Sequence, residues 1–172
     1  MKKAIVGVIK LFPDGYLDFV QHLFATVTPI DRFAVSDWRD AEAVLTLLFY
    51  FGDGCNVNLG TNPHRNRFVS ILVDLFSSEI IVKHYHFSIL LVAMDIISRY
   101  LPLLAPLESI RYQLLTIFIT GLNSNRERSR DRAVSSLARF VASIKEGIIP
   151  YQQGILDAVQ VRSGFEITMR RT

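Results

Sequence analysis

The sequence predicts an all-α protein built from stacked pairs of helices. Apolar residues recur at the three-and-four spacing of a helix face through most of the 172 residues, and clear strand-like alternation is absent. Long helix-like segments begin near Ser36, Val82 and Arg126, and each is followed by a second one. Starts that lie about 45 residues apart indicate a repeated structural unit.

This spacing is typical of HEAT and armadillo repeats, whose helix pairs bury their apolar faces only by stacking on one another. We therefore expect a HEAT-like α-solenoid of about three to four antiparallel helix pairs, with a binding function. The predicted division is a partial repeat and connector at 1–35, repeats at 36–81, 82–125 and 126–162, and a frayed or incomplete tail at 163–172.

The N-terminal part is predicted to hold two short helices, over residues 5–12 and 16–27. Residues 13–15 read Pro-Asp-Gly, which predicts a turn between them. The two lysines before the first apolar run are reminiscent of a signal peptide, but Lys10 cuts that run too short for a signal or a membrane span. We therefore expect no membrane insertion.

The next unit should be a helical hairpin around an exposed loop. Ser36 is a suitable N-cap for a helix over residues 37–51, which Gly52 and Gly54 are expected to end. The second helix of this pair follows an Asn- and Gly-rich loop. Its buried stripe is predicted to be Phe68, Ile71, Leu72, Leu75 and Phe76.

The two later units follow the same plan. The most apolar pair is expected at residues 83–100 and 108–122, separated by Pro102 and Pro106. The last pair should end with a helix over residues 151–161. The face of its first helix is predicted to carry Ala133, Val134, Leu137, Phe140, Val141 and Ile144.

Patterns that support catalysis or cofactor binding are missing from the sequence. The single Cys55 has no metal-ligand partner nearby, and the four histidines lack the spacing of a zinc hydrolase. A glycine-rich phosphate loop and a nucleophile elbow are also absent. We expect neither an enzyme nor a site for a metal, a cofactor or a small-molecule substrate.

One cluster of basic residues has functional character. Cations near a helix N-terminus cost about 0.3–1 kcal/mol each, so a sequence that keeps several there has a use for them, on phosphates or on acidic partners. The alternative is a solvated loop, partly neutralised by Glu127 and Asp131. The candidate binding residues are Arg126, Arg128, Arg130, Arg132 and Arg139.

Three of these arginines share a helix face. Arg128, Arg132 and Arg139 are spaced so that they form one basic ridge, which suits a polyanion. A smaller basic patch lies at another helix start, where Arg65 and Arg67 follow His64. The net charge of +3 is compatible with nucleic-acid contact but does not demonstrate it.

Two stretches resemble the Exportin-T family of the karyopherin-β class, and the matching region spans residues 36–161. One is SRDRAVSSLARFVASIKEGIIPYQQGILDAVQ, whose resembling positions include Arg130, Arg132, Arg139 and Lys145. The other is DWRDAEAVLTLLFYFGDG, an acidic-tryptophan helix start that runs through a Leu-Leu core to a glycine. This chain is similar to a segment from the middle of such a receptor.

The resemblance implies a carrier that shuttles between nucleus and cytoplasm and wraps tRNA and the GTP-bound form of Ran inside its solenoid. It also implies nuclear pore proteins as partners, and no catalysis. The alternative is a HEAT-type or armadillo-type scaffold that binds a protein or peptide in its groove without RNA contact.

Overall fold

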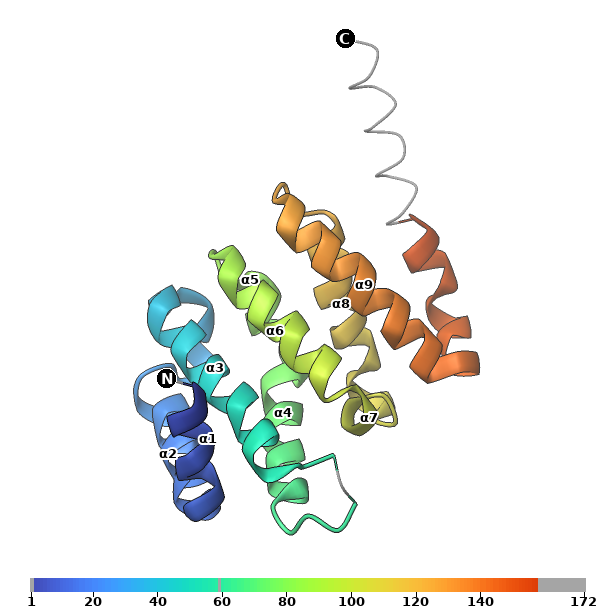
Figure 1. Cartoon of the computed structure of the whole chain (residues 1–172). Helices are drawn as coiled ribbons and strands as arrows, with labels where there is room; N and C mark the ends of the chain where they lie inside the picture. The colour runs from blue at the N-terminus through green and yellow to red at the C-terminus, as the bar shows by residue number, and fades with distance from the viewer. Residues whose placement is uncertain (1, 59, 158–172) are drawn as a thin grey trace.

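The computed structural model describes residues 2–58 and 60–157, and these residues form an all-α, HEAT-like solenoid (Figure 1). Three short 3₁₀ helices, labelled η, lie between or after the α-helices. The elements in chain order are α1 (Lys2–Leu11), α2 (Pro13–Thr26), η1 (Ile30–Val35), α3 (Trp38–Cys55), α4 (Arg65–Ser77), α5 (Ile80–Lys83), α6 (Phe87–Arg99), α7 (Leu101–Leu104), η2 (Glu108–Ile110), α8 (Arg111–Leu122), α9 (Glu127–Ile144) and η3 (Lys145–Tyr151).

The long helices form two layers. One layer is the row α1, α3, α6 and α9, in which each helix contacts the next (Figure 1). Behind this row lie α2, α4 and α8, and α8 packs against α4, α6 and α9. The core fills the space between the layers. Among the described residues, no helix combines the length and the apolar character needed to cross a bilayer.

Local capping sets several helix starts differently from the prediction. Pro13 does not form part of a turn but is the first residue of α2, where a missing N–H costs nothing. Ser36 is not the N-cap of α3, because its hydroxyl donates to the carbonyl of Phe33 at 2.8 Å. Asp37 is the cap, and its Oδ1 accepts from the N–H of Arg39 at 2.8 Å.

The glycines of α3 do not end the helix as predicted. The helix continues through Gly52 and Gly54 to Cys55 and ends at Asn56, whose φ is 50°. Both glycines are buried. A Cβ built on Gly52 would overlap the ring of Tyr100, and one on Gly54 would lie 2.5 Å from Cγ2 of Ile9. The glycines therefore allow α6 and α1 to approach the backbone of α3 closely.

Aromatic side chains fill the core where α3, α4 and α6 meet. The Phe68 ring lies 5.5 Å from the Phe51 ring and 4.9 Å from the Tyr100 ring, measured between centroids. Tyr100 is fully buried, which raises the pKa of its hydroxyl, and this hydroxyl donates to the carbonyl of Phe49. The stripe predicted on the second helix of this pair is confirmed, since all five of its residues are buried in α4.

The later helices are more broken than predicted. A separate short helix, α5, precedes α6, and Pro102 lies inside the short α7 instead of in a connector. Of the six residues predicted on the buried face of α9, Ala133, Leu137, Phe140 and Ile144 are buried and Val141 is partly buried against the core. The prediction is wrong at Val134, which is 46% exposed. Residues 152–157 are helical, and the remainder of the helix and tail predicted there lies outside the described residues.

We predict that Gly52→Ala destabilises the fold by about 1–3 kcal/mol, because the new methyl group has no space beside Tyr100. Urea denaturation followed by circular dichroism measures the change. Gly7→Ala is the control, since nothing lies within 4 Å of its Cβ position in α1 and alanine should add about 0.5–1 kcal/mol. Equal stability changes in both variants would contradict the close approach of α6 to α3.

Candidate RNA interface

Helix α9 carries the candidate interface, and its buried face fixes which side chains reach the surface. Its buried residues contact α8 and α6, so the opposite face is exposed. Ser136 is part of this contact, and its hydroxyl shares a buried hydrogen bond of 2.8 Å with that of Ser98 on α6. The buried residues of α9 are Ser129, Ala133, Ser136, Leu137, Phe140 and Ile144.

Two of the five predicted arginines contribute to the fold at the start of α9. Arg130 is half-buried, and its Nη1 donates to the carbonyl of Ser124 at 3.0 Å. The Arg126 guanidinium lies over the ring of Phe87, 5.3 Å from its centroid. These contacts link the loop before α9 to the helix itself and to the start of α6.

Arg128 and Arg132 lie on the exposed face one turn apart, beside one carboxylate of α6. The Nε of Arg132 is 3.0 Å from Oδ1 of Asp95. Burial raises the pKa of Asp95, and the positive charges of Arg132 and Arg128 oppose that shift. The two side chains lie along the same shallow cleft, together with Glu127, Asp131 and Ser135. This part of the ridge is basic but partly neutralised.

Arg139 continues the same face two turns further along α9 and is exposed. It lies beside a separate cleft near α7, which Arg111 and Lys145 also line. The basic ridge, defined as Arg128, Arg132 and Arg139, therefore runs along one side of α9 and ends at this cleft.

The smaller basic patch is mostly used within the fold. Arg67 on α4 bonds to Asp18 and Gln21 of α2, and its Nη1 lies 4.0 Å from Oδ1 of Asp14. Its role is to tie α2 to α4. Arg65 is half-buried. These contacts make Arg67 a structural link between neighbouring helices.

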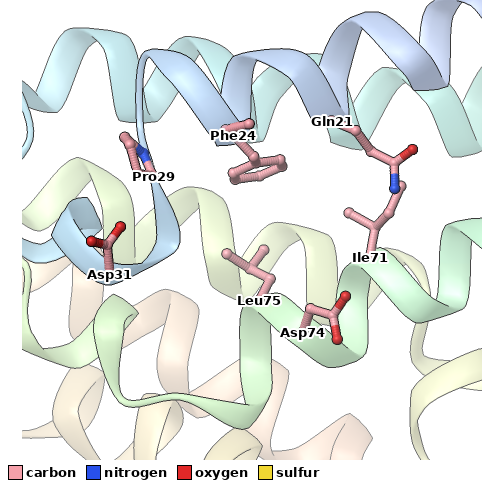
Figure 2. A pocket seen from close by; sticks show the side chains of 8 residues that line it. Gln21, Phe24, Pro29, Asp31, Ile71, Asp74 and Leu75 are labelled. Atoms are coloured by element: carbon pink, nitrogen blue, oxygen red, sulfur yellow. The ribbon is translucent and has the colours of Figure 1, made fainter.

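A cleft of about 410 Å³ lies between α2, η1 and α4 (Figure 2). Phe24 projects into it from α2, and Leu75 and Ile71 face it from α4. Asp31 and Asp74 lie at its border, so the cleft has apolar walls and an acidic edge. This cleft could not be predicted from the sequence, because its residues come from three separate segments.

Histidines join η1, α3 and α6 near the first turn of α6. The Nδ1 of His86 accepts from the N–H of Ser88 at 3.3 Å, and its ring stacks on Trp38 with centroids 4.1 Å apart. His84 is buried against Phe33, and burial lowers its pKa. In the described part of the chain, no three His, Cys, Asp or Glu side chains gather closely enough to hold a metal ion.

Comparison with known proteins identifies the family. The Exportin-T family model matches residues 8–162. The chain belongs to the Exportin-T family. Exportin-T of Chaetomium globosum is 22% identical over 166 residues, which cover 92% of this chain and 16% of that protein. This chain thus spans about a sixth of the length of its Exportin-T relative, and no solved structure matches it.

We predict that replacing Arg130 with glutamine destabilises the protein more than replacing Arg128 with glutamine. Arg130→Gln removes the bond to the Ser124 carbonyl and should cost about 1 kcal/mol. Arg128→Gln removes only an exposed charge and should stay within about 0.5 kcal/mol of the parent. Thermal unfolding measures both, and a larger loss for Arg128→Gln would contradict these assignments.

We predict that the fold loses stability in mild acid through His84. Because burial lowers its pKa, the folded state binds fewer protons than the unfolded state, so its contribution is full above the ordinary pKa of 6.5 and is lost as the pH falls below it. Urea midpoints at about pH 7.5 and 5.5 measure the loss. His84→Gln should reduce the difference between the two pH values; an unchanged difference would argue against His84 as its source.

Proposed function

We propose that this chain is a segment of a nuclear export receptor that binds tRNA together with the GTP-bound form of Ran. The family match supports the receptor, and the exposed basic ridge on α9 supports RNA contact by this segment. The proposal includes shuttling between nucleus and cytoplasm, contact with nuclear pore proteins, and repeat units that begin near residues 36, 82 and 126. It includes no catalytic step.

The ridge suits the phosphate backbone of a folded RNA better than a single small anion. Its arginines are spaced along about 11 residues of one helix, which correspond to roughly 16 Å. Guanidinium groups bind phosphate oxygens through paired N–H donors, and such contacts follow the shape of an RNA more than its sequence. Arg126 and Arg130 support this surface by fixing the start of α9.

Cooperation between tRNA and Ran would be a coupling between two binding sites on one solenoid. Each ligand would favour the same curvature of the stacked helices, so each would raise the affinity for the other by the same factor. Each helix of the row α1, α3, α6 and α9 contacts the next, so a change in curvature at one end of the row could be transmitted to the other through packed helices.

A protein-binding scaffold is the second candidate, and the cleft of Figure 2 favours it. Phe24, Leu75 and Ile71 offer apolar contacts for a peptide side chain, and Asp31 and Asp74 suit basic neighbours of that side chain. This interpretation predicts binding that tolerates loss of the ridge arginines and requires no RNA.

We predict that removal of two ridge charges weakens tRNA binding and its salt dependence. Filter binding of tRNA over about 50–300 mM KCl should show affinity falling with salt, and Arg128→Gln with Arg132→Gln should reduce the log–log slope by about 1.5. Asp95→Asn should act in the opposite direction and tighten binding, because it releases Arg132 from its ion pair.

Arg32→Gln is the matched control, since Arg32 is exposed on η1 and is paired only with its neighbour Asp31 at 3.9 Å in the described structure. This variant should keep the parental slope. A slope unchanged by the Arg128 and Arg132 variants would remove the ridge assignment. Absence of binding even at low salt would count against RNA contact by this segment and in favour of the scaffold.

A further inference from the structure

A second basic feature lies at the C-terminal end of α9, where a cavity of about 640 Å³ opens between α7 and α9. We call it the α7–α9 cleft. Helix α7 contacts α9 and supplies one wall, with Leu101 and Pro102, while the last turn of α9 supplies the other. Its charged lining residues are Arg111, Arg139 and Lys145, and no described carboxylate lines it.

Arg111 is held in place before any ligand binds. Its side chain is only 15% exposed, its Nε donates to the carbonyl of Ala105 at 3.1 Å, and its Nη1 donates to Oε1 of Glu108 at 3.2 Å. Glycine at position 147 makes room for it, because a Cβ there would lie 2.9 Å from Nη1. The Glu108 carboxylate is 83% exposed, so water screens its charge.

Arg139 and Lys145 complete the cationic rim, and both are exposed. Neither forms an ion pair with a described carboxylate. Lys145 has a φ of 45°, a backbone region that glycine adopts far more readily than other residues. Lys145 lies next to the break between α9 and η3, so it places a cation at the mouth of the cleft at this backbone cost.

The combination of charge and apolar wall decides the class of ligand. Three cations around one cavity favour an anion. The bonds to Ala105 and Glu108 use two of the five N–H donors of Arg111, so the two hydrogens of Nη2 and one of Nη1 remain for phosphate oxygens. The exposed Pro102 and Pro106 offer an apolar surface beside these charges, which suits the ribose or base attached to a phosphate. Acidic side chains alone would use the cations and leave this wall uncovered.

We propose that the α7–α9 cleft is a phosphate-binding subsite for the RNA backbone, in which Arg111 is the fixed donor and Arg139 and Lys145 close over the phosphodiester. This proposal rests on the proposed tRNA-binding function and adds a second place of contact to the ridge. The RNA backbone would then follow α9 from Arg128 to its C-terminal end.

The test combines tRNA filter binding with a direct probe of Arg111. The double variant Arg139→Gln with Lys145→Gln should reduce the log–log salt slope by about 1.5 and weaken binding about 10-fold near 0.1 M salt. Arg32→Gln with Lys83→Gln removes the same formal charge from exposed sites on η1 and α5, and should leave the slope within about 1 unit of the parent. Circular dichroism verifies that both variants are folded.

The direct probe is sodium pyrophosphate, titrated while the Nε–H signal of Arg111 is followed by NMR. A saturable shift in the parent that is lost in the double variant supports the subsite. Arg111→Lys keeps the charge without the paired donors and should weaken both tRNA and pyrophosphate binding.

The outcomes separate this proposal from the one on which it rests. If tRNA binds and depends on Arg128 and Arg132, but the cleft variant keeps the parental slope and pyrophosphate shifts nothing, the subsite is wrong and the proposed function stands. If tRNA does not bind at low salt, both are overturned. If a polyglutamate peptide shifts the Arg111 signal and tRNA does not, the cleft serves an acidic protein, and the RNA assignment is overturned.

Discussion

The arrangement of the helices depends on how closely α1 and α6 pack against α3. Gly52 and Gly54 remove the side chains that would separate α3 from α6 and α1, and Tyr100 and Ile9 occupy the space. The Tyr100 hydroxyl then reaches the carbonyl of Phe49, so a polar group inside the core is satisfied by the backbone it packs against. The absence of these two side chains thus sets how closely α1 and α6 pack on α3.

The position of α6 is passed on to α9 through polar contacts in addition to apolar packing. Ser98 and Ser136 share a buried hydrogen bond, and Asp95 pairs with Arg132 on the border of the same interface. Because a buried hydroxyl pair requires matched positions along both helices, it fixes how far α9 is displaced along α6. The contacts on the buried side of α9 therefore determine which of its residues are exposed. They also determine the direction in which the basic ridge runs.

The sequence was sufficient for the helical class and for most buried stripes, because three-and-four periodicity reports burial directly. The sequence was insufficient where one residue pattern is compatible with two different structural roles. Gly52 and Gly54 satisfied the usual pattern for a helix end, yet their role is close packing on Tyr100 and Ile9, which are distant in the chain. The sequence placed Arg128, Arg132 and Arg139 on one helix face but gave no role to Arg126 and Arg130 apart from binding; in the fold these two hold the start of α9. The α7–α9 cleft could not be predicted from the sequence, since Arg111 and Lys145 belong to segments that only the fold brings together.

The two ends of α9 differ in how their positive charge is balanced. At the N-terminal end the helix dipole opposes cations, and Glu127, Asp131 and Asp95 lie close to Arg128 and Arg132. At the C-terminal end the dipole favours cations, and the carboxylate paired with Arg111, that of Glu108, is well solvated and does not line the cleft. A polyanion lying along α9 would therefore meet a weaker field at Arg128 than at Arg139 and Lys145. Phosphate binding should be strongest where the fold has fixed Arg111, and the ridge would then orient the remainder of the RNA backbone relative to that point.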